Sequence, residues 1–217
     1  MEGWKGGAII LVLVLLTACA LSPEEAAIQA VQESQGITRI SPGTLRLLQT
    51  QPWQDGVMVL IRYQTLEENG QIAECVSLYE AQRQQLGWAS GGGGGGCWAG
   101  GGHSEPIGIG AGQHSGNGRP GLSYVYGLVY DERVAAVSVM WDDGEEQQVQ
   151  VVNGSYLALR AGAHDYGEVR ALDAEGNTIH TQPSPHPAPG KESRRPANHP
   201  TFQSSIHPSF HKERNLA

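Results

Sequence analysis

The stretch SGGGGGGCWAGGGHSEP, residues 90–106, invites a phosphate-binding interpretation, because glycine-rich loops present backbone N–H groups to phosphates. A P-loop also needs a Gly-Lys-Ser/Thr sequence that opens a helix, and the chain has no lysine between Lys5 and Lys191. A dinucleotide fingerprint needs Gly-x-Gly-x-x-Gly between a strand and a helix. The segment GIGAGQHSG, residues 108–116, has different spacing and precedes no helix-forming segment. The glycines therefore predict no phosphate site and no bound cofactor.

Four carboxylates follow one another in the segment DDGEE: Asp142, Asp143, Glu145 and Glu146. They lack the spaced ligands of a calcium-binding EF-hand. A catalytic carboxylate pair would need a cleft that raises one of the two pKa values. The pattern favours a hairpin turn that is kept soluble by its charge.

Histidines offer a second route to chemistry. Six of them lie in stretches without an expected element: His103, His114, His186, His199, His207 and His211. A zinc site needs four ligands fixed by a second shell, and such stretches supply neither. Solvated histidines and no resident metal are expected. An envelope hydrolase or metal-dependent enzyme stays an alternative if the fold brings His164, Asp165 and Glu168 into one pocket with another acid.

The chain has three cysteines, Cys19, Cys75 and Cys97. Cys19 follows the apolar run AIILVLVLL, residues 8–16, whose length suits a signal peptide and is too short for a membrane-spanning helix. In an exported protein the other two cysteines are expected to form a disulfide, which would stabilise the fold by roughly 3 kcal/mol. Two free thiols are the alternative.

The residues Leu16, Thr17, Ala18 and Cys19 resemble the lipobox of bacterial lipoproteins. The resemblance implies cleavage before Cys19, a diacylglyceryl group on its sulfur, and attachment of the protein to the cell membrane on the extracytoplasmic face. Two or more acyl chains hold a protein at a membrane durably. An ordinary secretory signal with a chance cysteine is the alternative. Residues 1–18 are therefore predicted to be a lipoprotein signal peptide.

The chain has 217 residues and a net charge of −8, so it lacks the basic surface that binding to nucleic acid requires. Gly91–Gly121 holds 15 of the 30 glycines and is expected to be a flexible linker. Residues 183–217 are rich in proline and histidine and are expected to be disordered. These two segments bound two modules, residues 19–90 and 122–182.

The first module is predicted to be a helix on an antiparallel sheet. Ser22, Pro23 and Glu25 form a capping box with proline at the first helical position, and the helix continues to Gln35, before Gly36. Period-two alternation then predicts four strands: residues 45–50, 57–64, 72–81 and 84–90. In the order of its elements this layout resembles cystatin-like and NTF2-like proteins.

The second module is predicted to be a small sandwich of roughly immunoglobulin-like shape. Strands are expected at residues 123–130, 135–141, 147–152, 156–160, 168–173 and 177–181, with turns at residues 142–144, 153–154 and 175–177. Alternation places Val137, Val139 and Trp141 in its core. The block from Tyr124 to Leu159 also resembles modules of uncharacterised bacterial envelope lipoproteins, a resemblance that implies no activity.

These patterns together predict an α+β chain that is a lipid-anchored envelope protein without enzymatic activity. Its partners would be the membrane and a protein or cell-envelope ligand, and an accessory domain that is only recognised by others fits equally well. Trp53 and Trp98 are the expected contact surface. Trp88 is expected in the core.

Overall fold

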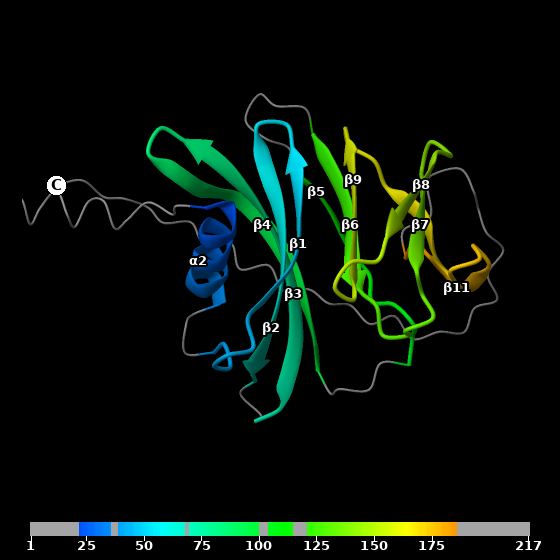
Figure 1. Cartoon of the computed structure of the whole chain (residues 1–217), viewed down its shortest axis with the longest axis horizontal. Helices are drawn as coiled ribbons and strands as arrows, with labels where there is room; N and C mark the ends of the chain where they lie inside the picture. Colours follow the sequence, from blue (N-terminus) through cyan, green and yellow to red (C-terminus); the bar gives the residue numbers. More distant parts are fainter. Residues whose placement is uncertain (1–21, 36–38, 68–69, 100–103, 115–120, 186–217) are drawn as a thin grey trace, which may run out of the picture.

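The computed structural model describes residues 22–35, 39–67, 70–99, 104–114 and 121–185. They form four layers, one helix and three antiparallel sheets, stacked side by side (Figure 1). This is the α+β class with a β-sandwich that the sequence predicts. No helix within these ranges has the length and apolar character needed to cross a bilayer. The predicted signal peptide and nearly all of the predicted disordered tail lie outside the described residues.

The first layer is the helix α2 (Pro23–Gln35), and the predicted capping box opens it. The backbone N–H of Glu25 donates to Ser22 Oγ, and the N–H of Ser22 donates to Glu25 Oε2, both at 3.2 Å. The helix buries Ala26, Ala27 and Val31 against the first sheet. Its predicted end at Gly36 lies outside the described residues.

The second layer is a four-stranded sheet in the order β1-β2-β3-β4. Its strands are β1 (Arg46–Trp53), β2 (Gly56–Leu66), β3 (Ile72–Gln84) and β4 (Gly87–Ala99). All four predicted strands are present. We refer to α2 and this sheet as the helix–sheet module.

The third and fourth layers form the predicted sandwich. One sheet has the order β5-β6-β9, and the other has the order β11-β10-β7-β8. The strands are β5 (Gly110–His114), β6 (Leu122–Leu128), β7 (Ala136–Trp141), β8 (Glu146–Gln150), β9 (Ser155–Ala161), β10 (Tyr166–Leu172) and β11 (Thr178–Pro183). Val137, Val139 and Trp141 are buried between the two sheets, as predicted. The sandwich continues to Ser184, which is buried, so its end lies slightly beyond the predicted residue 182.

The helix–sheet module and the sandwich share one hydrophobic core. Leu60 and Leu78 of the first sheet pack in the same cluster as Leu128 and Leu157 of the sandwich. The sheet β5-β6-β9 is therefore covered on both faces, which explains the nearly continuous burial along β6 and β9.

Polar contacts join the two modules at one edge. The Gln49 side-chain amide donates to Ser155 O at 2.8 Å, and the Asn153 amide donates to Leu48 O at 2.8 Å. Together with the shared core, these bonds fix the sandwich to the first sheet.

The prediction of a flexible linker at residues 91–121 is wrong for two segments. Gly91–Ala99 continues β4 and pairs with β3, and Gly110–His114 forms β5 and pairs with β6. The physical reason is the partner across each strand: Tyr79 lies opposite Gly93, Tyr126 opposite Gly110 and Tyr124 opposite Gly112.

The tyrosine rings lie across these glycines, in the space that a side chain would fill. A Cβ atom at Gly93 would lie 2.5 Å from Tyr79 Cδ1, and one at Gly110 would lie 2.6 Å from Tyr126 Cζ. Burial of the rings and the hydrogen bonds of the ladder offset the backbone entropy that ordering glycine costs.

Two neighbouring glycines of β4 provide a matched test. At Gly93 an added Cβ would also lie 2.5 Å from the backbone oxygen of Leu78, whereas at Gly94 it would meet only Tyr124 Oη, at 3.5 Å. We expect Gly93→Ala to lower the free energy of unfolding by about 1–3 kcal/mol, as overpacking does. Gly94→Ala should leave it within about 1 kcal/mol. Urea unfolding of both variants measures the difference, and equal stabilities would contradict the proposed packing.

Candidate functional site

The two cysteines expected to pair are joined. Cys75 of β3 and Cys97 of β4 are directly opposite in the register and form a disulfide, with their Cα atoms 4.0 Å apart. The bond ties the edge strand β4 to β3 just beyond the glycine run. It occupies both sulfur atoms, so neither cysteine serves as a nucleophile. Cys19 lies outside the described residues.

The two tryptophans expected to form a contact surface are not neighbours. Trp53 ends β1 and pairs with Gly56, while Trp98 pairs with Glu74 near the opposite end of the sheet and on its other edge. Both rings are half-buried against the core that the modules share. The structure therefore does not bring Trp53 and Trp98 together. Trp88 is half-buried as well, against the helix-side core.

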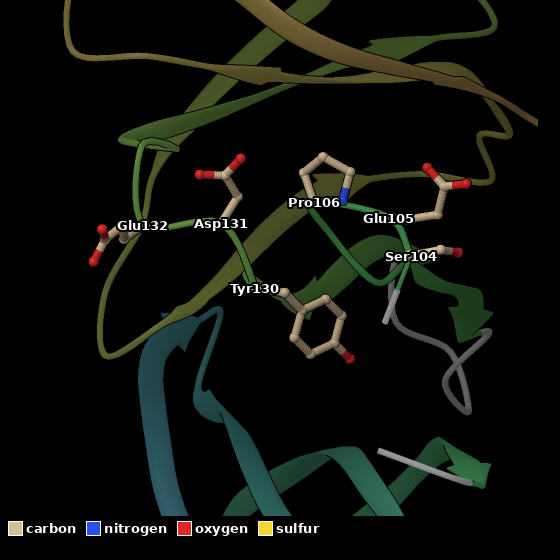
Figure 2. A pocket seen from close by; sticks show the side chains of 6 residues that line it. All are labelled: Ser104, Glu105, Pro106, Tyr130, Asp131 and Glu132. Atoms are coloured by element: carbon tan, nitrogen blue, oxygen red, sulfur yellow. The ribbon is translucent and has the colours of Figure 1, made fainter. Parts of the chain in front are cut away.

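An open pocket of about 460 Å³ lies between two loops of the sandwich. Six residues line it: Ser104, Glu105, Pro106, Tyr130, Asp131 and Glu132. The Pro106 carbonyl accepts the backbone N–H groups of Tyr130, at 2.8 Å, and Asp131, at 3.2 Å, and thereby holds the loops together. Figure 2 shows the Glu105, Asp131 and Glu132 carboxylates spread along the two loops that line the pocket. The Tyr130 ring points away from the Asp131 carboxylate. We call this site the Tyr130 pocket.

Acidic groups dominate the electrostatics of the Tyr130 pocket, since three of its six lining residues are carboxylates and none is basic. Asp131 is paired with Arg133, whose hydrogen bonds lower the pKa of the carboxyl to about 2. Asp131 therefore stays ionised over the whole physiological range. Glu105 contacts His180 Nε2 at 3.2 Å.

Tyr130 links the pocket to the helix–sheet module. Burial of its hydroxyl and the nearby charge of Glu74 together raise its pKa to about 12, while Arg62 opposes the shift. Tyr130 is therefore a neutral hydroxyl at physiological pH. Tyr130 and Trp98 pack against the same hydrophobic cluster, so the pocket lies beside the end of the first sheet where Trp98 pairs with Glu74.

The chemistry available in the pocket is recognition of a positive charge. Carboxylates accept strong hydrogen bonds from ammonium and guanidinium groups. The Tyr130 ring points away from the carboxylates and packs against the core that the modules share. No histidine is among its lining residues, so Ser104 has no imidazole base there. Sequence reasoning missed this site because residues 104–106 fell inside the expected linker. The acidic residues at positions 105, 131 and 132 were the available signal, but only the fold brings them together.

A second polar cluster lies at the β7–β8 turn, where Asp142 and Asp143 approach His164. Asp142 Oδ1 is 3.2 Å from His164 Nδ1, and Asp142 Oδ2 accepts the backbone N–H of Asp165 at 3.2 Å. Burial raises the pKa of Asp142, but the hydrogen bonds from Asp165 and His164 together outweigh it and lower the pKa overall.

The ligand atoms of Asp142, Asp143 and His164 lie close enough to surround a metal ion. Arg160, however, already pairs with Asp143 and with Glu145 and stacks on the Trp141 ring, 5.6 Å from its centroid. A metal would have to compete with this guanidinium for Asp143. The arrangement accords with the charged turn that the sequence predicts, with ion pairs that fix it.

Of the three residues on which the enzymatic alternative depends, His164, Asp165 and Glu168, the fold brings only the first two to the same cluster. His164 and Asp165 lie beside Asp142, whereas Glu168 pairs with Arg170 at 2.6 Å. Of the histidines expected to be solvated, His114 instead lies 3.4 Å from the buried carboxylate of Glu80. His103, His186, His199, His207 and His211 lie outside the described residues.

No protein-family model, no curated protein and no solved structure matches the chain. The comparisons therefore assign no family. Inferences about function rest on the side chains of this chain and on their arrangement.

The lowered pKa of Asp142 predicts the direction of an acid effect. A carboxyl with a folded pKa below its unfolded value of about 3.9 stabilises the fold fully above that value. That contribution is lost as the pH falls through the lower, folded pKa.

We expect Asp142→Asn to be less stable than the wild type at neutral pH and to approach the wild-type stability in acid. His164→Gln should lose part of the same contribution, because the Asp165 bond remains. Urea unfolding between about pH 2 and pH 6 measures both, and parallel profiles of Asp142→Asn and wild type would refute the coupling.

Proposed function

We propose that this chain is a lipid-anchored extracytoplasmic protein, acylated on Cys19, that binds a positively charged ligand group in the Tyr130 pocket. The observation that carries the anchor is the Cys75–Cys97 disulfide, because it leaves Cys19 as the one remaining cysteine of three. That cysteine directly follows the apolar run and closes the lipobox-like sequence. A disulfide also suits the oxidising compartment to which export leads.

The length of chain behind the anchor supports a position close to the membrane. The fold begins at the capping residue Ser22, three residues after Cys19. Three residues span at most about 11 Å. An acyl group on Cys19 would therefore hold the start of α2 at the lipid surface.

The direction of α2 supports an outward-facing pocket. After the helix, the carbonyl of Arg39 accepts the N–H of Leu66, and Ile40 bridges to Thr65, so the C-terminal end of α2 leads to the end of the sheet where β2 and β3 join. Glu74 of β3, which influences Tyr130, lies near that same end. The N-terminal end of α2 points the other way (Figure 1). In this orientation the anchor and the pocket lie at opposite ends of the molecule.

The anchor is tested by substitution of Cys19. We expect Cys19→Ser to abolish acylation, so that intact-mass measurement finds no diacylglyceryl group and the protein leaves the membrane fraction. Cys75→Ser combined with Cys97→Ser removes the other cysteines and should still be acylated. Wild-type protein that carries no acyl group in the membrane extract would refute the proposal.

The pocket is tested with a lysine-containing peptide as the probe. We expect Glu132→Gln to weaken binding up to about fivefold, as the loss of one exposed charge pair of up to about 1 kcal/mol implies. Glu24→Gln at the start of α2, at the opposite end of the molecule, changes the net charge equally and should bind like the wild type. Calorimetric titration measures the affinities. Equal losses in both variants would indicate a nonspecific charge effect and contradict a site at the pocket.

A further inference from the structure

Two turns of the first sheet carry exposed leucines, and they lie at opposite ends of it. At the β2–β3 end, Leu66 is 57% exposed and pairs with Ile72, which is 54% exposed. At the β3–β4 end, Leu86 is 78% exposed, the largest exposure among the large apolar side chains of the described residues. The strand β3, of 13 residues, separates the two turns by about 40 Å. We call them the Leu66 turn and the Leu86 turn.

The position of α2 distinguishes between the two turns. Its C-terminal end leads into Arg39 and the backbone of Leu66, so its N-terminal end is directed toward the Leu86 turn. Trp88, two residues beyond Leu86, packs into the same helix-side core as Ala26 and Ala27 of the first helical turns. In Figure 1 the start of α2 lies at the end of the sheet where β3 and β4 are joined.

We propose that the Leu86 turn is a second membrane contact, in which Leu86 enters the headgroup region of the lipid surface to which Cys19 is anchored. This inference rests on the proposed acylation of Cys19. The reach from Cys19 to Ser22 is about 11 Å, so the helix start cannot leave the surface. Of the two apolar turns, only the Leu86 turn lies at this end.

The residues behind Leu86 suit a lipid surface. Arg83 of β3 pairs across the hairpin with Trp88 of β4. The Arg83 side chain is exposed, so its guanidinium can reach lipid phosphates. The Trp88 ring is half-buried in the helix-side core and supports the turn from behind.

The charge of the segment also favours a lipid contact. No acidic residue occurs from Ala81 to Ala99, although the chain as a whole carries −8. Next to the Leu66 turn, by contrast, stands Glu67, whose carboxylate an anionic membrane would repel. Glu74 at the same end is paired with Arg62. Glu24 and Glu25 open α2 at the Leu86 end, where the positive end of the helix dipole offsets part of their charge. Asp55, in the β1–β2 turn, is a further carboxylate at that end.

The test places an environment-sensitive fluorophore at each turn. Leu86→Cys and the matched control Leu66→Cys each add one thiol to an exposed turn, while Cys75 and Cys97 stay joined and Cys19 is acylated. Both labelled proteins are bound to vesicles of phosphatidylethanolamine and phosphatidylglycerol. We expect a blue shift and a rise in emission at position 86, and the emission of a water-exposed probe at position 66. In the Leu86→Cys protein that also carries Cys19→Ser, vesicles should leave the emission unchanged, because one apolar side chain does not bind a membrane stably.

The outcomes separate this inference from the anchor. Acylated protein that floats with the vesicles while position 86 stays water-exposed would overturn the Leu86 contact and leave the anchor intact. A blue shift at position 66 in place of position 86 would likewise overturn it. Protein without an acyl group that does not float would overturn both proposals.

Discussion

The packing of tyrosine rings across glycines in neighbouring strands is the interaction on which the order of this chain depends. It occurs between β3 and β4, between β5 and β6, and again between β6 and β9, where Tyr156 lies opposite Gly127. At Gly127 an added Cβ would lie 1.8 Å from the backbone oxygen of Gly108 and 2.8 Å from Tyr156 Cε1, so a carbonyl and the ring together fill the space above the glycine. Burial raises the pKa of the Tyr126 and Tyr156 hydroxyls well above the ordinary value, which reflects how fully these rings leave solvent. The glycines supply the room, and the rings supply the buried area that a glycine strand lacks.

A consequence of this packing is that β6 and β9 of the middle sheet are covered on both faces. The helix–sheet module covers one face of β6 and β9, and the outer sheet of the sandwich covers the other. With Gln49 and Asn153 bonded across the same boundary, the two modules form one body. The two ends of that body, one at the start of α2 and one at the Tyr130 pocket, therefore keep a fixed separation. In the proposed orientation, this fixes the height of the pocket above the membrane.

The elements that local rules specify could be predicted from the sequence. The capping box at Ser22 and Glu25 defines the start of α2. The charged turn at residues 142–144 follows β7, in which Val137 and Val139 are buried as the sequence pattern predicts. The order of β4 and β5 could not be predicted, because six glycines carry no periodicity and the tyrosines that order them lie in other strands. The pocket escaped prediction for a related reason: its walls come from loops that are 24 or more positions apart in the chain, between Pro106 and Tyr130. For Trp53 and Trp98 the residue type predicted one shared contact surface, but the strand register places them at opposite ends of the sheet.

The disulfide lies at one end of an edge strand, directly after the glycine run. β4 is an edge strand, paired only with β3 among the described strands, and its glycines add no side-chain burial of their own. Such a strand would separate most easily at an end, and Cys97 lies directly after the last glycine of the run. The bond to Cys75 closes that end and keeps Trp98 beside Glu74, whose charge reaches Tyr130. Cys75 itself is buried in the helix-side core with Ala27 and Val31, so the bond ties the end of β4 to a well-packed strand. The pairing of Cys75 with Cys97 therefore has two effects. It stabilises the glycine strand, and it supports the part of the first sheet that lies next to the pocket.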